Sequence, residues 1–158
     1  MNKLNTKKGF TIIEVVLVLA IAGLIFLMVF IALPALQRNQ RDTQRKNDLS
    51  RIQSAVNSYQ ANNKGKIPGS GELNTLRDSY LKAGGDSFQD PTGRDYSLAY
   101  SASATGVANA TWSETGNVSI QYVVGAKCDL EAVVAAGGTN KVALRMALEG
   151  GGQYCLNN

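Results

Sequence analysis

A single apolar run, residues 15–36, restricts what this 158-residue chain can become. The run is interrupted only by Gly23 and Pro34 and reads VVLVLAIAGLIFLMVFIALPAL. As a helix rising 1.5 Å per residue it would span about 33 Å, enough to cross a hydrocarbon core of about 30 Å. A cleaved secretory signal has a shorter apolar core, about 7–15 residues, followed by a small-residue cleavage site. Here the polar residues QRNQR follow the run, so we expect a retained membrane span.

The basic charges lie on either side of this run. The formal net charge is +4 at pH 7. Lys3, Lys7 and Lys8 precede the run with no acidic residue beside them, and a second basic stretch, the collar, occupies residues 37–51. The lysines place the N-terminus on the cytoplasmic side of a membrane, whereas the collar argues weakly for the opposite orientation. Charge counting alone therefore leaves the orientation of the span open.

Glu14 is the one charged residue between positions 10 and 36. A carboxylate at the edge of an apolar run is costly unless it meets a partner, and such groups often mark a function. From position alone two interpretations remain. Glu14 is either tolerated in the lipid headgroup layer, or it is kept for a specific partner.

The residues before the run form a specific signature, KKGFTIIE, from Lys7 to Glu14. It resembles the class III signal of type IV prepilins and pseudopilins, in which a basic leader ends in Gly, the mature chain begins with Phe, and Glu is its fifth residue. The resemblance implies a leader at residues 1–9, cleavage between Gly9 and Phe10 by a prepilin peptidase, and methylation of the new Phe10 amine. It also implies that Glu14 pairs with the Phe10 amine of a neighbouring subunit during assembly. That amine, with an ordinary pKa of about 8, is mostly cationic at neutral pH and needs a counter-charge in an apolar filament core.

The proline of the run departs slightly from the family pattern. Many members place the helix-kinking proline a few residues earlier, where this chain has Ile31. Because proline removes one helical hydrogen bond, we expect a bend or a locally melted stretch between Gly23 and Pro34.

The helix is expected to continue beyond the run. Leu49, Ile52, Val56 and Tyr59 recur at helical spacing, which predicts one helix over residues 10–62, about 80 Å long. The chain would then comprise the leader, a membrane or filament-core half of the helix, an amphipathic half and a globular head, at residues 1–9, 10–36, 37–64 and 65–158. Such a helix is too long for the head to bury. We therefore expect it to pack against identical helices in a homo-oligomeric filament.

The head is predicted to be rich in β-structure. A short helix and three strands are expected, at residues 73–81, 96–100, 119–124 and 142–148. The segment 101–118, rich in Ala, Ser, Thr and Gly, is expected to be a loop or a weak hairpin. These elements predict an α+β fold in which a small antiparallel sheet packs on the amphipathic half of the long N-terminal helix, as in the pilin fold.

Two further features of the head resemble parts of related families. The turn DPTGRDY, from Asp90 to Tyr96, is similar to the D-P-x-G-x-x-Y turn of type II secretion pseudopilins. Cys128 and Cys155 are too far apart for a CxxC redox or zinc motif, and a disulfide is the favoured interpretation in an exported head. The pair resembles the C-terminal disulfide-bounded region of type IV pilins. By loop-closure entropy such a bond would stabilise the head by about 3.5 kcal/mol.

Several chemistries are excluded or disfavoured. Without histidine the chain has no Ser-His-Asp relay and no His-ligated zinc site. Asp86, Asp90 and Asp95 raise the question of calcium, but they lack the compact spacing of an EF-hand loop, and surface solubility explains them more simply. No metal and no cofactor are therefore expected.

The basic residues of the collar could contact nucleic acid, but the sequence supports this only weakly. It has no interleaved aromatic residue for base stacking, and Asp42 and Asp48 interrupt it. The alternatives are a solvated helix face, contact with lipid headgroups, or bridges to neighbouring subunits.

Three functions remain in view. We favour a structural pilin, the subunit of a type IV pilus used for adhesion, motility or DNA uptake, over a pseudopilin or minor pilin of a type II secretion-like system. A membrane-anchored enzyme or binding protein is a remote third, and we expect no enzyme activity. The favoured interpretation implies a single-pass membrane protein that becomes an extracellular filament, with prepilin peptidase and the pilus assembly machinery as partners.

Overall fold

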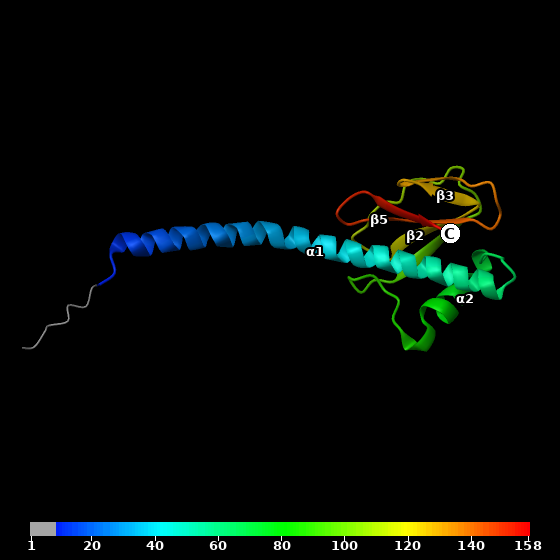
Figure 1. Cartoon of the computed structure of the whole chain (residues 1–158), viewed down its shortest axis with the longest axis horizontal. Coiled ribbons are helices and arrows are strands. Elements are labelled where there is room, and N and C mark those ends of the chain that lie inside the picture. The colour runs from blue at the N-terminus through cyan, green and yellow to red at the C-terminus, as the bar shows by residue number, and fades with distance from the viewer. Residues whose placement is uncertain (1–8) are drawn as a thin grey trace, which may run out of the picture. The chain divides into compact units, whose positions relative to one another are not determined.

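The computed structural model describes residues 9–158, so the leader lysines Lys3, Lys7 and Lys8 lie outside the described residues. The longest element is helix α1 (Ile12–Asn62), which contains 51 residues (Figure 1). The chain divides into two compact units, Met1–Gln37 and Arg38–Asn158, and α1 contributes residues to both.

The first unit contains the apolar part of α1, and the large apolar side chains of this part are exposed. Val29 is the least exposed of the large apolar side chains between Ile12 and Leu36, and it is still 43% exposed. Among the described residues, α1 is the one helix long and apolar enough to cross a membrane. It passes through Gly23 and Pro34 without an interruption, so the bend expected there stays a prediction.

The later part of α1 supplies one wall of the core of the second unit. Leu49, Ile52, Val56 and Tyr59 are each 7% exposed or less, which confirms the helical stripe. The helix ends where predicted. Lys64 has a φ of 55° and Gly65 a φ of 79°, and the Gly65 N–H donates to the Gln60 carbonyl at 2.8 Å, a left-handed turn typical of helix C-termini.

Opposite this stripe lies a four-stranded sheet with the order β1-β2-β5-β6. The strands are β1 (Tyr96–Ser101), β2 (Val118–Val124), β5 (Val142–Ala147) and β6 (Gln153–Asn157). Ile120 and Leu144 join the α1 stripe in one apolar cluster. The predicted α+β architecture, a long N-terminal helix with a small β-sheet packed on it, is confirmed.

The sheet is mixed, whereas we expected it to be antiparallel throughout. β2 pairs antiparallel with β5 and β5 with β6, but β1 and β2 are parallel. A parallel neighbour requires a crossover connection of about a dozen residues or more, and the loop of residues 102–117 provides it. Arg145 of β5 donates to the Ala108 carbonyl at 2.7 Å and thereby ties this loop to the sheet. The loop covers part of that face, and this cover contributes to the burial of all six residues of β5.

A two-stranded ribbon, β3 (Ala126–Asp129) and β4 (Ala132–Ala135), was not predicted. β3 packs against β5 and β6, and Cys128 and Val133 of the ribbon join Val123 and Ala143 of the sheet in a second small apolar cluster. Cys128 of β3 and Cys155 of β6 form a disulfide with their Cα atoms 5.7 Å apart. The bond therefore fastens the ribbon to the edge of the sheet.

Short helical turns close the other side of the core. They are η1 (Ser70–Glu72), α2 (Leu73–Leu76), the single π-helical turn η2 (Arg77–Leu81) and η3 (Ala83–Gly85). Leu73, Leu76 and Leu81 are buried in the core cluster, in agreement with the short helix expected over residues 73–81.

Candidate functional site

The predicted cleavage position, Gly9–Phe10, is fully accessible in the first unit. Phe10 is 91% exposed. Among residues 9–158, no atom lies within 4 Å of the position that a Cβ on Gly9 would occupy, and the φ of Gly9 is not in the left-handed region. Neither the packing nor the backbone of the part of the chain that the structure describes therefore requires glycine at position 9. A requirement for glycine would have to come from a molecule that binds there, as an endopeptidase does.

Glu14 lies at the first turn of α1 and is held by Thr11. Its Oε2 atom accepts hydrogen bonds from the Thr11 backbone N–H at 2.8 Å and from the Thr11 hydroxyl at 2.7 Å. The Glu14 N–H in turn points to the Thr11 hydroxyl at 3.4 Å. This reciprocal arrangement is a capping box, which satisfies N–H groups that the first turn of a helix leaves unpaired.

The capping box gives Glu14 a role that we did not predict. The sequence signal was available, because Thr-x-x-Glu before an apolar run is typical of a capped helix start. The carboxylate thus stabilises the helix start within its own chain, beside the exposed Phe10. Any pairing with a neighbouring amine would have to compete with Thr11 or share the carboxylate with it.

In the second unit the collar joins a set of buried ion pairs. We call Arg41, Asp42, Arg45, Asp90 and Glu149 the charged cluster. The Arg45 side chain is 0% exposed, and its Nε atom lies 2.6 Å from Asp90 Oδ1. Its Nη1 atom lies 2.8 Å from Asp42 Oδ1 and 3.1 Å from Glu149 Oε2. Three carboxylates therefore pair directly with Arg45.

The charged cluster connects three segments of the head. Asp42 on α1 accepts hydrogen bonds from the backbone N–H groups of Glu149 and Gly150, at 3.0 Å and 2.8 Å. Arg41, one residue earlier, donates to Glu149 from its Nε atom at 2.8 Å. Asp90 belongs to the turn before β1, and Glu149 belongs to the turn between β5 and β6. The cluster thus fastens both turns to α1.

Two of its carboxyl groups, those of Asp90 and Glu149, are held in the charged form. The hydrogen bond from Arg41 lowers the pKa of Glu149 to about 2, against the opposing effect of burial. Burial alone would raise the pKa of Asp90, but hydrogen bonds from Arg45 and Thr92 outweigh it and hold the pKa below its ordinary value. These two carboxyl groups are consequently ionised at neutral pH, and the cluster acts as a structural clamp.

Trp112, the single tryptophan of the chain, lies between two arginines. The Arg45 guanidinium is 4.2 Å from its ring centroid and that of Arg94 is 4.8 Å away. Such stacking is favourable because the ring face carries negative potential. Trp112 therefore covers the charged cluster and anchors the crossover loop to it.

These contacts correct two expectations. Asp90 is 2% exposed, so surface solubility does not explain it. Asp42 and Arg45 are buried, so the collar is not a solvated face at these positions. Asp86 does pair at the surface, with Arg51 at 2.6 Å, and Asp95 accepts from Gln89 at 3.1 Å.

The three aspartates do not converge on a common point. Within residues 9–158, no three His, Cys, Asp or Glu side chains come together in a group that could hold a metal ion. Contact of the collar with nucleic acid stays a prediction. Arg41 and Arg45 already use their hydrogen-bonding groups within the head, which leaves them less available to phosphates.

Comparison with known proteins identifies the first unit alone. The prokaryotic N-terminal methylation motif matches residues 4–30. No curated protein matches the chain. No solved structure matches it either. The matched segment contains Gly9, Phe10 and Glu14, and the chain thus carries the class III signal peptide of type IV pilins and pseudopilins.

Proposed function

We propose that this protein is the structural subunit of a type IV pilus filament. Prepilin peptidase removes residues 1–9 and methylates Phe10, and the mature chain leaves the membrane for a filament outside the cell. Residues 10–36 form the filament core, residues 37–64 join it to the head, and residues 65–158 form the head. The methylation motif at the start of an uncovered apolar helix is the observation that carries this proposal.

The physical argument for assembly rests on the uncovered helix. Soluble monomers rarely expose apolar patches larger than a few hundred Å², so the side chains of residues 12–36 need lipid or other protein around them. Exchange of lipid for identical helices costs little, since both surroundings are apolar. Glu14 then makes the contact specific, because its carboxylate pairs with the Phe10 amine of the preceding subunit.

A pseudopilin of a secretion system is the second candidate. The Asp90–Tyr96 turn favours it, because its sequence resembles the D-P-x-G-x-x-Y turn of type II secretion pseudopilins. The disulfide between Cys128 and Cys155 favours the pilin. Both candidates are structural proteins, and neither requires an active site.

The test separates the charge of Glu14 from its capping role. Glu14→Gln removes the charge, but glutamine can still cap the helix. Thr11→Ala weakens the cap and keeps the charge. We expect processed Glu14→Gln chains that assemble poorly, and Thr11→Ala chains that assemble nearly as well as the wild type. Electron microscopy of surface filaments, with mass spectrometry of their main component and of its N-terminus, provides the measurement.

Each outcome has a defined meaning. Normal filament numbers in Glu14→Gln would contradict the pairing role. Wild-type filaments without this chain as main component would favour the pseudopilin or a minor subunit. A wild-type chain that keeps residues 1–9 would contradict processing altogether.

A further inference from the structure

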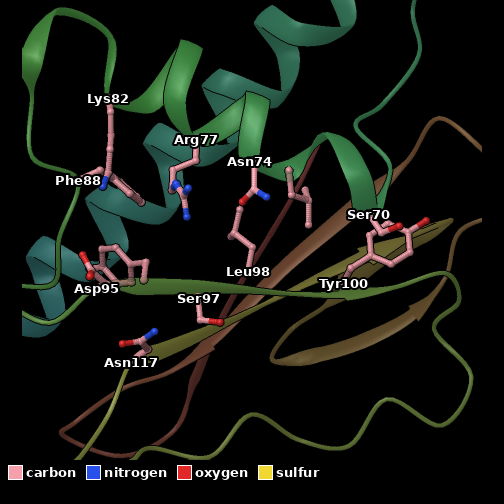
Figure 2. Close-up of a pocket in the computed structure, with 12 residues that line it drawn as sticks. Ser70, Asn74, Arg77, Lys82, Phe88, Asp95, Ser97, Leu98, Tyr100 and Asn117 are labelled. Atoms are coloured by element: carbon pink, nitrogen blue, oxygen red, sulfur yellow. The ribbon is translucent and has the colours of Figure 1, made fainter.

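A cleft of about 470 Å³ opens in the head between α2 and the edge strand β1. This volume lies within the range of cavities that bind small molecules, about 300–1,000 Å³. Figure 2 shows Asn74 and Arg77 reaching toward β1 from the helical side, with Ser97 and Asn117 on the other side of the strand. A ligand in the cleft would therefore lie along the edge of β1 and contact side chains on both sides of it.

The exposed part of the lining is polar and mostly uncharged. Leu73 and Phe88 also line the cleft, but both are buried in the core beneath it. Hydroxyl and amide side chains each donate and accept hydrogen bonds. Four such side chains line the cleft at exposed positions, those of Ser70, Asn74, Ser97 and Asn117.

The charged residues of the cleft do not select a charged ligand. Arg77 donates to Asp78 at 2.9 Å, and Asp95 accepts from Gln89 at 3.1 Å. Lys82, the other cation of the lining, shares the cleft with Asp95. An anion would meet Asp95, and a cation would meet Arg77 and Lys82. A neutral ligand avoids both repulsions.

The edge of β1 adds backbone groups to these side chains. The Asp95 carbonyl accepts from the Val118 N–H at 3.0 Å, so the backbone groups of Asp95 and Ser97 face β2. The backbone groups of Leu98 and Tyr100 alternate with them and face outward, where no strand of residues 9–158 pairs with them. The cleft thus offers unpaired backbone donors and acceptors beside the polar side chains.

Tyr100 supplies an aromatic surface at one end of the cleft (Figure 2). It is 38% exposed, and its ring stacks on that of Tyr122 with 6.1 Å between the centroids. Because Tyr122 is fully buried, this contact holds the Tyr100 ring in place. A ring that is supported on one side and open on the other can pack against the C–H groups of a sugar.

We propose that the cleft between α2 and β1 binds a neutral saccharide. Sugar hydroxyl groups both donate and accept hydrogen bonds, which matches the amides of Asn74 and Asn117 and the hydroxyl of Ser97. The C–H face of the sugar packs on Tyr100. An extended peptide is the competing ligand for an open strand edge, but its specificity depends on pockets for its side chains, and the exposed lining here is polar.

This inference goes beyond the proposed function and does not depend on it. The cleft belongs to the second unit, so a single unassembled chain is sufficient for binding. Assembly would add avidity, because a filament repeats the cleft along its length. Linked sites of this kind bind a polymeric ligand about 10²- to 10⁴-fold more tightly than one site does.

Saturation-transfer NMR with the full chain tests the proposal. The chain is solubilised in a polyoxyethylene detergent, because a detergent with a sugar headgroup would compete for the cleft. The probes are maltotriose, cellotriose, mannotriose and triacetylchitotriose, which are neutral and differ in linkage and substituents. We expect saturable binding of at least one of them. An uncharged hexapeptide of alternating serine and valine represents the competing ligand and should not bind.

Asn74→Ala and Asn117→Ala locate the binding site. Each variant removes one exposed amide of the lining, so we expect a several-fold higher dissociation constant and an unchanged melting temperature. Asn57→Ala is the matched control, because Asn57 is also exposed but lines a separate hollow with Asn140. It should bind the trisaccharide as the wild type does.

The outcomes separate this inference from the proposed function. Binding of none of the four trisaccharides, or binding that Asn74→Ala and Asn117→Ala both retain in full, would overturn it. Binding of the hexapeptide alone would assign the edge of β1 to a peptide and would overturn it as well. None of these results bears on filament formation, and a wild-type chain that forms no filament would leave the saccharide site intact.

Discussion

At the scale of single residues, the head depends on side chains that neutralise one another out of contact with water. Arg45 is fully buried and its partner Asp90 is 2% exposed. Removal of one member of such a buried pair leaves an uncompensated charge, which is strongly destabilising. Surface pairs such as Arg51 with Asp86 contribute little by comparison. The burial of each pair, and not the number of pairs, therefore decides which substitutions matter.

The charged cluster predicts a dependence of stability on acid. The pKa of Glu149 falls from 4.5 to about 2 on folding, chiefly because of its hydrogen bond from Arg41. A folded-state pKa below the unfolded value stabilises the protein above pH 4.5, and this contribution is lost as the pH falls toward 2. We expect urea denaturation, followed by Trp112 fluorescence in non-ionic detergent, to show this decline, and Glu149→Gln to flatten it.

Glu114→Gln is the control for this measurement, because Glu114 is exposed. It should keep the wild-type pH dependence. If Glu149→Gln kept that dependence as well, the cluster would not be the source of the acid sensitivity.

At the scale of elements, periodic patterns were predictable and contacts between distant segments were not. The stripe from Leu49 to Tyr59 and the position of strand β5 follow directly from residue spacing. The direction of β1 was not predictable, because it depends on the path of residues 102–117 across the sheet. The ribbon β3–β4 was missed because each of its strands has only four residues and little alternation.

The same distinction between local patterns and distant contacts applies to the residues of the candidate sites. Gly9, Phe10 and Glu14 were predictable because they lie in one short motif. The pairing of Arg45 with Asp90 was not, since 45 residues separate them and only the folded chain brings them together. The capping role of Thr11 required only that a local pattern be recognised.

The ribbon is the element whose stability depends most on a covalent bond. Replacement of both cysteines, Cys128→Ser with Cys155→Ser, should lower the free energy of unfolding by about 3.5 kcal/mol, because the unfolded chain regains the entropy of an open loop. Hydrogen exchange should accelerate in residues 126–135. The backbone amides of β2 and β5, which are hydrogen-bonded within the four-stranded sheet, serve as the internal control. Equal stability and equal exchange with and without the bond would contradict this prediction.

At the scale of the whole molecule, the two units differ in the surroundings that they require. The first exposes a continuous apolar helix. The second has its own core, and every buried residue of its two apolar clusters lies at position 49 or later. The two units are therefore expected to respond separately to truncation.

We expect a chain that begins at Arg38 to fold without detergent, because it keeps the core and the whole charged cluster. A chain that begins at Lys46 keeps the same apolar core but loses Arg45, so Asp90 would remain buried without its partner. The shorter chain should be less stable by about 3–5 kcal/mol, the usual cost of a broken buried ion pair. Urea midpoints from Trp112 fluorescence, with molar mass from light scattering, provide the comparison. Equal midpoints would show that the apolar core alone holds the head together, and a chain from Arg38 that aggregates would show that the head requires the apolar helix.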